Sequence, residues 1–168
     1  LVDEFSSFAR LPNPNLKNNN ISTIISEVVS DYEKNNTNIK FINKLHSNQI
    51  NLKIDNSQIS RVFQNLIVNS IHSIDDSKKK DGEIIYSSCE MDDNIVISLT
   101  DNGIGLKYEK EELIKPYFTT KKKIGGSGLG LAIVEKILID HHAEFVISNR
   151  NDEESGAEVK ITFEKATT

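Results

Sequence analysis

Two clusters of glycine constrain this chain more than any other feature of its sequence. The first lies at residues 101–105 (DNGIG) and the second at residues 125–131 (GGSGLGL), and together they hold six of the eight glycines. Glycine reaches positive φ at little steric cost and lets a ligand approach the main chain closely. Paired clusters therefore suit a loop that wraps a phosphate-bearing molecule.

The second cluster runs directly into residues 131–138, a good helical sequence. Backbone N–H groups at the start of such a helix point towards an anion. Each cluster alone is a weak signal, because an Asp-x-Gly-x-Gly run is often only a turn after a strand. Their combination, with a helix after the second, is more specific and indicates one nucleotide site.

Composition narrows the class of protein. The net charge of -5 and the pI near 5.4 argue against a nucleic-acid partner, which usually meets a basic face. The 168 residues suit one domain with a real core. Cys89 is the single cysteine, which excludes an intrachain disulfide and favours a reducing compartment. Because no apolar run approaches the roughly 20 residues of a membrane span and no signal peptide opens the chain, we expect a cytoplasmic domain.

Apolar spacing and turn signals predict the elements of an α+β fold. Helices are expected over residues 21–34, over residues 56–74 after a capping box formed by Asp55 and Gln58, and over residues 129–139. Period-two alternation predicts six strands, of which a polar turn joins the first two: residues 39–45, 50–54, 83–89, 95–101, 143–148 and 157–163.

The first twenty residues differ from the rest. Leu1, Phe5 and Phe8 share one helical stripe, which prolines at 12 and 14 end. We interpret residues 1–10 as the tail of a longer helix and the residues up to Asn20 as a linker. A terminal helix packed on the domain is the alternative.

Polar side chains at two places can face the predicted site. Asn65 and Asn69 lie one turn apart on the polar side of the second helix, where they can hold an ion or a phosphate, or simply face solvent. Asp101 alternates with the apolar residues of its strand, so its carboxylate is expected on the buried face, where it needs a partner. The exocyclic amine of a purine is a suitable donor; capping of the following turn is the alternative.

The loop over residues 106–128 is long for a compact domain, and loops of this length are often functional lids. Tyr117 and Phe118 are expected to dock this lid on the domain. Lys121 can then reach a phosphate.

Four segments resemble, in the family's order, the N, G1, F and G2 boxes of sensor histidine kinases: residues 65–69 (NLIVN), 101–105, 116–121 (PYFTTK) and 126–131 (GSGLGL). The resemblance covers residues 21–165 and implies the ATP-binding (Bergerat) fold of the GHKL superfamily. This fold is a two-layer α/β sandwich, in which a mixed, mostly antiparallel sheet of about five strands carries three helices on one face. Residues 1–20 resemble the end of the dimerisation helix and its linker in NtrY-like nitrogen-regulation kinases, and residues 21–168 resemble the catalytic domain.

The resemblance implies a role for each matching residue. Asp101 would accept a hydrogen bond from the adenine amino group, and Gly103 and Gly105 would admit the base and ribose. Asn69 would ligate Mg²⁺ and Asn65 would help to hold the phosphates, so both asparagines are the implied catalytic residues. The other implied ATP contacts cradle the phosphate chain or, for the lysine, close over it: Gly126, Ser127, Gly128, Leu129, Gly130 and Lys121.

The implied reaction is transfer of the γ-phosphoryl group of ATP, with Mg²⁺, to a histidine nitrogen. None of the four histidines has the family's His-Glu/Asp setting: His46, His72, His141 and His142. The acceptor is therefore expected on a separate dimerisation domain that passes the phosphoryl group to a response regulator. The fragment is expected to be monomeric, and its parent to be a homodimer that is anchored in the inner membrane.

Three other functions differ in kind from a histidine kinase. A gyrase- or Hsp90-like ATPase would carry a glutamate base where Asn65 stands. An anti-sigma serine kinase shares the boxes, but the helix tail at residues 1–10 suits a sensor kinase better. In a degenerate binding module the boxes would only build a fold, and their intact asparagines and glycines argue against that.

Overall fold

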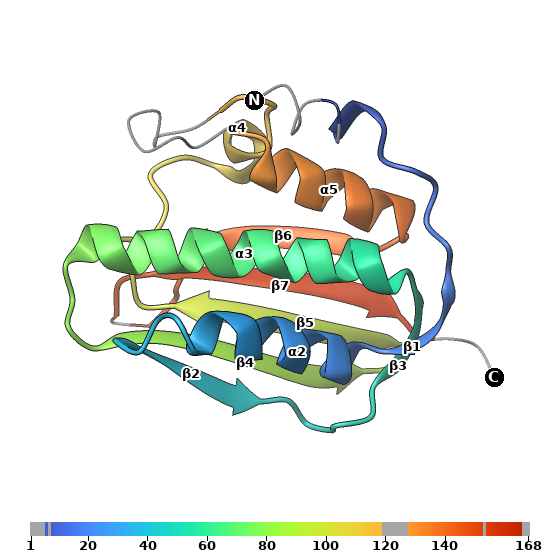
Figure 1. Cartoon of the computed structure of the whole chain (residues 1–168), viewed down its shortest axis with the longest axis horizontal. Helices are drawn as coiled ribbons and strands as arrows, with labels where there is room; N and C mark the ends of the chain where they lie inside the picture. The colour runs from blue at the N-terminus through green and yellow to red at the C-terminus, as the bar shows by residue number, and fades with distance from the viewer. Residues whose placement is uncertain (1–5, 7, 119–127, 153, 166–168) are drawn as a thin grey trace.

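A computed structural model of the chain describes residues 6, 8–118, 128–152 and 154–165 (Figure 1). The elements follow one another as β1 (Lys17–Asn20), α2 (Ile21–Glu33), β2 (Ile39–Lys44), β3 (Asn51–Ile54), α3 (Asn56–Ser77), β4 (Gly82–Met91), β5 (Asn94–Asp101), α4 (Lys110–Leu113), α5 (Gly130–Asp140), β6 (Glu144–Asn149) and β7 (Ala157–Glu164). Among these residues no helix is long and apolar enough to cross a membrane.

The main sheet has five strands in the order β2-β4-β5-β7-β6. β2 pairs parallel with β4, and the other neighbours pair antiparallel, so the sheet is mixed. Helices α2, α3 and α5 lie on one side of it (Figure 1). This arrangement confirms the predicted two-layer α+β fold. The short helix α4 was not predicted, because four residues are too few to show a helical period.

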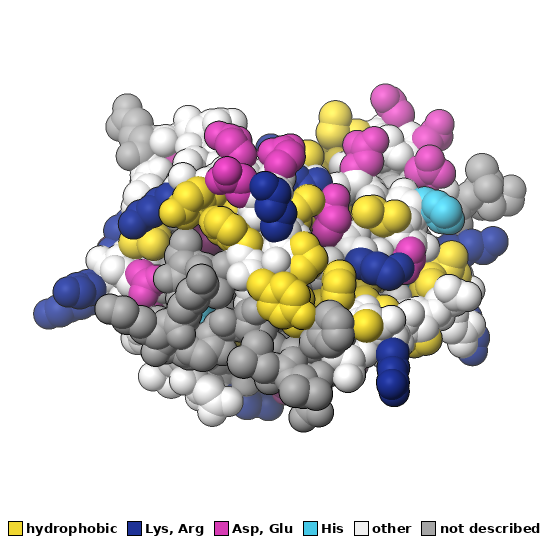
Figure 2. Space-filling view, turned by 90° about the horizontal axis from the view of Figure 1, so that it is seen from above, with side chains coloured by type: hydrophobic (Ala, Val, Ile, Leu, Met, Phe, Trp, Pro, Cys, Tyr) yellow, Lys and Arg dark blue, Asp and Glu magenta, His cyan; other side chains and the backbone are white. Residues whose placement is uncertain are grey.

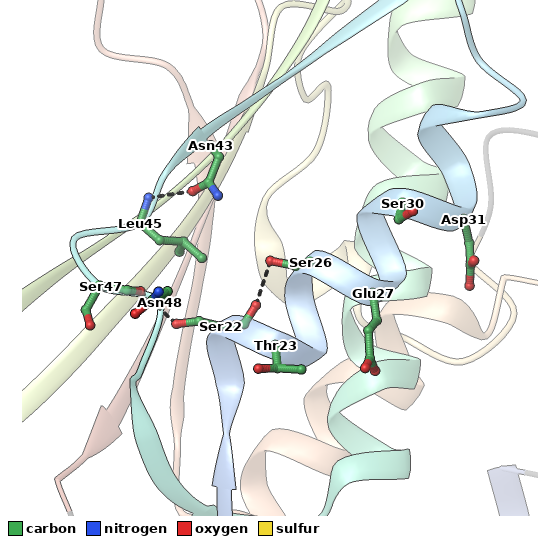
Figure 3. A pocket seen from close by; sticks show the side chains of 10 residues that line it. All are labelled: Ser22, Thr23, Ser26, Glu27, Ser30, Asp31, Asn43, Leu45, Ser47 and Asn48. Carbon is green, nitrogen blue, oxygen red and sulfur yellow. Dashed lines mark hydrogen bonds between the residues drawn. The ribbon is translucent and has the colours of Figure 1, made fainter.

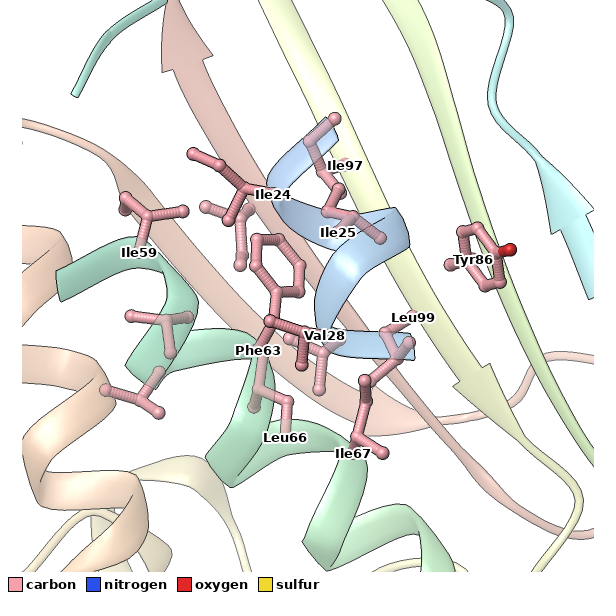
Figure 4. Packing of buried hydrophobic residues seen from close by; sticks show 14 of the residues in the cluster. Ile24, Ile25, Val28, Ile59, Phe63, Leu66, Ile67, Tyr86, Ile97 and Leu99 are labelled. Atoms are coloured by element: carbon pink, nitrogen blue, oxygen red, sulfur yellow. The ribbon is translucent and has the colours of Figure 1, made fainter. Parts of the chain in front are cut away.

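The predicted helices bury their apolar stripes as expected. Asn20 caps α2 by accepting a hydrogen bond from the amide of Ser22 (3.0 Å). The apolar face of α2 packs against α3 and the sheet, where the side chain of Phe63 is 1% exposed (Figure 4). Burying one side chain of this size contributes about 1.5–3 kcal/mol. The same apolar stripes that predicted these helices therefore pack them against each other and against the sheet.

The segment that we interpreted as a linker contains a strand. β1 pairs antiparallel with β3, from Lys17 opposite Ile54 to Asn20 opposite Asn51, as a separate two-stranded sheet. The two strands beside the predicted polar turn, β2 and β3, consequently belong to different sheets. A run of asparagines has no alternating apolar pattern, so the partner strand rather than the local sequence specifies β1.

The opening helix is described only in part. Ser6, Phe8 and Ala9 are helical, and Phe8 packs against the core. This contact agrees with a helix packed on the domain. Continuation of the helix into a dimerisation domain stays a prediction.

The predicted capping box at the start of α3 is half formed. Oδ1 of Asp55 accepts hydrogen bonds from the amide of Gln58 (3.0 Å) and the hydroxyl of Ser57 (2.9 Å). Gln58 does not reach back: its Oε1 accepts no hydrogen bond from the described residues, while its Nε2 donates to the carbonyl oxygen of Pro12 (2.8 Å). The amide of Asp55 donates instead to Nε2 of His141 (3.0 Å). The start of α3 is therefore tied both to the segment before β1 and to the end of α5.

The other side of the main sheet carries none of the three long helices. Alternation along β4 places Cys89 on that side, opposite Val96 of β5. Cys89 is exposed.

Candidate functional site

Asp101 ends β5 with its side chain on the buried face, as predicted, and is 4% exposed. Its Oδ1 accepts three hydrogen bonds, from the amide of Gly103 (2.9 Å), the amide of Ala157 (3.4 Å) and the hydroxyl of Ser73 (3.3 Å). The bond from Gly103 shows that the alternative interpretation, a cap on the following turn, also holds. Recognition of adenine by Asp101 stays a prediction.

Burial raises the pKa of the Asp101 carboxyl above its ordinary value, because the charged form loses its hydration. Hydrogen bonds from Gly103, Ser70, Ala157 and Ser73 act in the opposite direction. The site thus keeps a carboxylate in an apolar setting by surrounding it with donors from α3, from the turn after β5 and from β7.

Gly156 packs against the main chain of Asp101, and the sequence analysis did not predict this role. Its φ is +134°, and a Cβ on it would lie 1.9 Å from the carbonyl oxygen of Asp101. Arg150 hydrogen-bonds to both residues: its amide donates to the carbonyl oxygen of Gly156 (3.1 Å), and its Nη1 donates to the carbonyl oxygen of Asp101 (3.5 Å). The available signal was a lone glycine at the end of a polar turn, directly before an alternating strand.

Asn102 is a second structural residue that sequence reasoning missed. It is 5% exposed, and its Oδ1 accepts a hydrogen bond from the amide of Glu83 (2.8 Å) while its Nδ2 donates to the carbonyl oxygen of Asp81 (2.9 Å). The turn after β5 is therefore fastened to the start of β4.

The glycines of the first cluster allow close contacts with other parts of the protein. A Cβ on Gly103 would lie 2.2 Å from Oγ and 2.5 Å from the carbonyl carbon of Ser73, so glycine lets this turn contact α3. Gly105 has φ +76°, and a Cβ there would lie 2.6 Å from Oδ1 of Asn149. Packing within the protein is therefore one reason for glycine at both positions. The approach of the base and ribose to these glycines stays a prediction.

The two asparagines of α3 lie one turn apart, as predicted, but differ in burial. Asn65 is half-buried and its Nδ2 donates to the carbonyl oxygen of Arg61 (2.9 Å), whereas Asn69 is exposed. Oδ1 of Asn65 lies 3.1 Å from where a Cβ on Gly130 would stand. The structure therefore brings the first asparagine beside the start of α5. His72 is exposed one turn further along α3.

The second glycine cluster is described from residue 128 onwards; Lys121, Gly126 and Ser127 lie outside the described residues. Gly128 has φ +72°, and a Cβ on it would lie 2.5 Å from the carbonyl carbon of Tyr117. Leu129 is fully buried and occupies the N-cap position of α5 without a side-chain capping bond. Its main chain, rather than its side chain, is therefore the part suited to a ligand.

The donor chemistry fits a magnesium ion that is shared with phosphate. Within the described residues, no group of three or more His, Cys, Asp or Glu side chains is placed to hold a metal. Mg²⁺ is usually held by one or two protein oxygens together with substrate phosphates and water. The exposed Asn69 and the half-buried Asn65 are neutral oxygen donors of this kind.

A hollow of about 550 Å³ lies elsewhere, between α2 and the connection from β2 to β3 (Figure 3). Hydroxyl, amide and acidic side chains line it, including Ser26, Glu27 and Asn43. Ser26 donates to the carbonyl oxygen of Ser22 (2.8 Å), so part of its lining is already used within the helix. The predicted site residues that the structure describes do not line this hollow.

Comparison with known proteins identifies relatives with the same fold. Residues 54–167 match the family model described as histidine kinase-, DNA gyrase B- and HSP90-like ATPase. Nitrogen regulation protein NtrY of Azorhizobium caulinodans is 32% identical over 167 residues, which cover 97% of this chain and 21% of that protein. The chain therefore spans about a fifth of this relative's length.

Solved structures agree with this family. The nucleotide-free catalytic domain of histidine kinase ThkA is 26% identical, with a TM-score of 0.76 over 90% of this chain and 96% of that one. The histidine kinase ThkA in complex with response regulator protein TrrA also matches, with 26% identity and a TM-score of 0.76 over 98% of this chain and 46% of that chain.

Proposed function

The chain belongs to the family of histidine kinase-, DNA gyrase B- and HSP90-like ATPases, and we propose that it holds Mg-ATP between Asp101 and the start of α5. It is the ATP-binding catalytic domain of an NtrY-like sensor histidine kinase. The observation that carries the proposal is a buried carboxylate at the end of β5, on the face of the sheet that the helices cover. In that helical layer Asn65 of α3 lies beside Gly130 at the start of α5.

Each part of the site has a distinct task in this proposal. Asp101 accepts a hydrogen bond from the adenine amino group through the carboxylate oxygen that faces the ligand. Asn65 and Asn69 present amide oxygens, with Asn69 toward the metal, and the main chain at the start of α5 donates N–H groups to the phosphates. Bound Mg²⁺ supplies neutralisation of the phosphate charge. The protein's own contribution is then to position the γ-phosphoryl group for in-line attack.

His141 at the end of α5 is buried, and both of its ring nitrogens are engaged, with the carbonyl oxygen of Ile137 and the amide of Asp55, so it does not suit a phosphoryl acceptor. The phosphoryl acceptor in our proposal is a histidine of a dimerisation domain in the parent protein, which forms a homodimer anchored in the inner membrane. A response regulator then receives the phosphoryl group, a partner of the kind seen with the related ThkA. The Gly126-to-Gly130 main chain and Lys121 complete the proposed contacts to ATP.

The kinase is favoured over the ATPase and serine-kinase alternatives by its relatives, which are sensor histidine kinases. The position of Asn65 gives a chemical reason as well. An amide cannot take a proton from an attacking water, whereas a glutamate at this place could.

Calorimetry of the wild-type chain with Mg-ATP tests nucleotide binding directly. We expect binding that weakens when Mg²⁺ is removed. Incubation with labelled ATP and a supplied dimerisation domain should then phosphorylate that domain on histidine, with little free phosphate and no phosphoserine. Rapid phosphate release in the absence of the dimerisation domain would instead identify an ATPase.

A further inference from the structure

Helix α4 lies on the segment that leads from the first glycine cluster towards the second. Only four residues long, it has no buried residue, and Glu109 at its N-cap position makes no side-chain capping bond. Isolated helices this short are unstable in water. The position of α4 must therefore be set by contacts from outside the helix.

Lys110 provides such contacts. Its Nζ donates to the carbonyl oxygen of Phe145 on β6 (2.6 Å) and lies 3.2 Å from Oε2 and 3.4 Å from Oε1 of Glu135 on α5. The ammonium group also lies 4.8 Å from the centre of the Phe145 ring. The side chains of Lys110 and Glu135 are each 24% exposed, and Oε2 of Glu135 accepts no hydrogen bond from the described residues. Lys110 is therefore a charge that compensates this carboxylate.

A second attachment lies at the other end of β6. Oδ1 of Asn149 accepts a hydrogen bond from the amide of Leu106 (2.6 Å), and its Nδ2 donates to the carbonyl oxygen of Leu106 (3.2 Å). Because β6 is an edge strand of the main sheet, its outer side is open to such contacts. Side chains thus hold the chain from Leu106 to α4 along this edge.

The same segment reaches the second glycine cluster. After α4, the Phe118 ring meets that of Tyr108 edge-on at 5.0 Å. The main chain of Tyr117 lies against Gly128, two residues before α5 begins. On the face that carries α4 and α5, hydrophobic side chains lie exposed among acidic and basic ones (Figure 2). Ile114, the C-cap residue of α4, is partly buried against the hydrophobic core, so this apolar contact and the polar contacts of Lys110 together set the position of α4.

We propose that Lys110 is a positioning residue for the phosphates of ATP. By holding α4 on α5 and β6, it sets where the Tyr117 main chain meets Gly128, and thereby the position of the amides that lead into α5. The inference rests on the proposed function, because it requires Mg-ATP to bind at those amides. It assigns Lys110 no contact with the nucleotide.

The test compares Lys110→Met with Lys110→Arg, which keeps the charge, and with Lys136→Met as a matched control. Lys136 lies on the same helix as Glu135 and pairs with Asp140 (2.8 Å) at the surface. Calorimetry with Mg-AMPPNP measures binding that includes the phosphates, NMR titration with adenosine measures binding of the base end alone, and thermal unfolding without nucleotide measures stability. Lys110→Met should weaken Mg-AMPPNP binding about tenfold. Adenosine binding should be unchanged and Tm close to that of Lys136→Met, while Lys110→Arg should keep most of the affinity.

The outcomes separate this inference from the proposed function. Absence of Mg-AMPPNP binding by the wild-type chain would overturn both. If the wild type binds and Lys110→Met binds equally well, the inference alone fails. It also fails if Lys110→Met lowers Tm and weakens adenosine and Mg-AMPPNP alike, since Lys110 would then be a general structural residue. Glu135→Gln gives an independent check, because it removes the partner charge and should reproduce the loss with Mg-AMPPNP.

Discussion

The two ends of the proposed ATP site differ in burial. Asp101, at the end proposed for the base, is 4% exposed and accepts hydrogen bonds from Gly103, Ser73 and Ala157. Asn69, at the end proposed for the phosphates, is exposed on α3. The base end is therefore complete before any ligand binds. Because the Asn69 side chain is exposed, metal and phosphate can set its orientation on binding. Changes at the base end should consequently disturb folding or recognition strongly, and changes at the phosphate end should mainly alter affinity.

The largest effect is expected for Gly156→Ala. The new methyl group would overlap the carbonyl oxygen of Asp101 in a backbone conformation that L side chains rarely adopt. We expect the free energy of unfolding to fall by about 3 kcal/mol or more, as measured by urea denaturation. Ser155→Ala in the same turn is the control and should stay within about 0.5 kcal/mol of wild type. Equal stability of the two variants would mean that the base end is less rigid than the contacts indicate.

Asp101→Asn tests recognition with little disturbance of the fold. The hydrogen bonds from Gly103, Ala157 and Ser73 converge on Oδ1, which an asparagine retains, so the variant should fold. Its amide group would face the adenine amine with a donor instead of an acceptor. Calorimetry should show ATP affinity reduced about a hundredfold, which corresponds to about 2.7 kcal/mol. Unchanged affinity in a folded variant would place the base elsewhere.

Asn69→Ala examines the exposed end. Affinity for Mg-ATP should fall about tenfold, because the metal loses a protein oxygen, while affinity for ATP in EDTA should change little. The free energy of unfolding should stay within about 0.5 kcal/mol of wild type, as is usual for exposed positions. An equal loss with and without Mg²⁺ would show that Asn69 does not act through the metal.

The smallest effect is expected at His141, which joins the ends of the two helices that carry the phosphate end. Its Nδ1 donates to the carbonyl oxygen of Ile137 (2.7 Å) and its Nε2 accepts from the amide of Asp55, so the ring is held neutral, and burial lowers its pKa. As the pH falls, the His141 ring therefore binds a proton in the unfolded state at a higher pH than in the folded state. Stability from this ring should be present above the unfolded pKa and lost as the pH falls through the folded pKa.

Comparison with His141→Gln isolates this contribution. Between pH 7.5 and pH 5, the wild type should lose about 1 kcal/mol more than the variant, the value of one hydrogen bond. Urea denaturation at several pH values measures the difference. Parallel pH profiles of the two proteins would contradict the assignment.

The parts of the fold that sequence could predict are those with a local period. The stripes of α2 and α3, the alternation that buries Asp101 and the one-turn spacing of Asn65 and Asn69 all follow from patterns within a single element. The resemblance to sensor kinases then connected these elements. The structure confirms the fold, but the roles of individual site residues in ATP binding remain predictions.

The features that sequence did not predict depend on distant partners. The amide of Asp55 meets His141 across 86 residues, and Lys110 meets Glu135 across 25. A single lysine or histidine shows no pattern that would identify its partner. Gly156 is similar, since its need for glycine arises from a carbonyl group on another strand.

Cys89 is the single cysteine of the sequence and offers one site for covalent labelling. It is exposed on the sheet surface turned away from α2, α3 and α5, so a maleimide dye can be attached there without replacing any native cysteine and without entering the candidate site. One label per molecule, with the same attachment in every variant, would let a single fluorescence assay follow nucleotide titrations across the whole series.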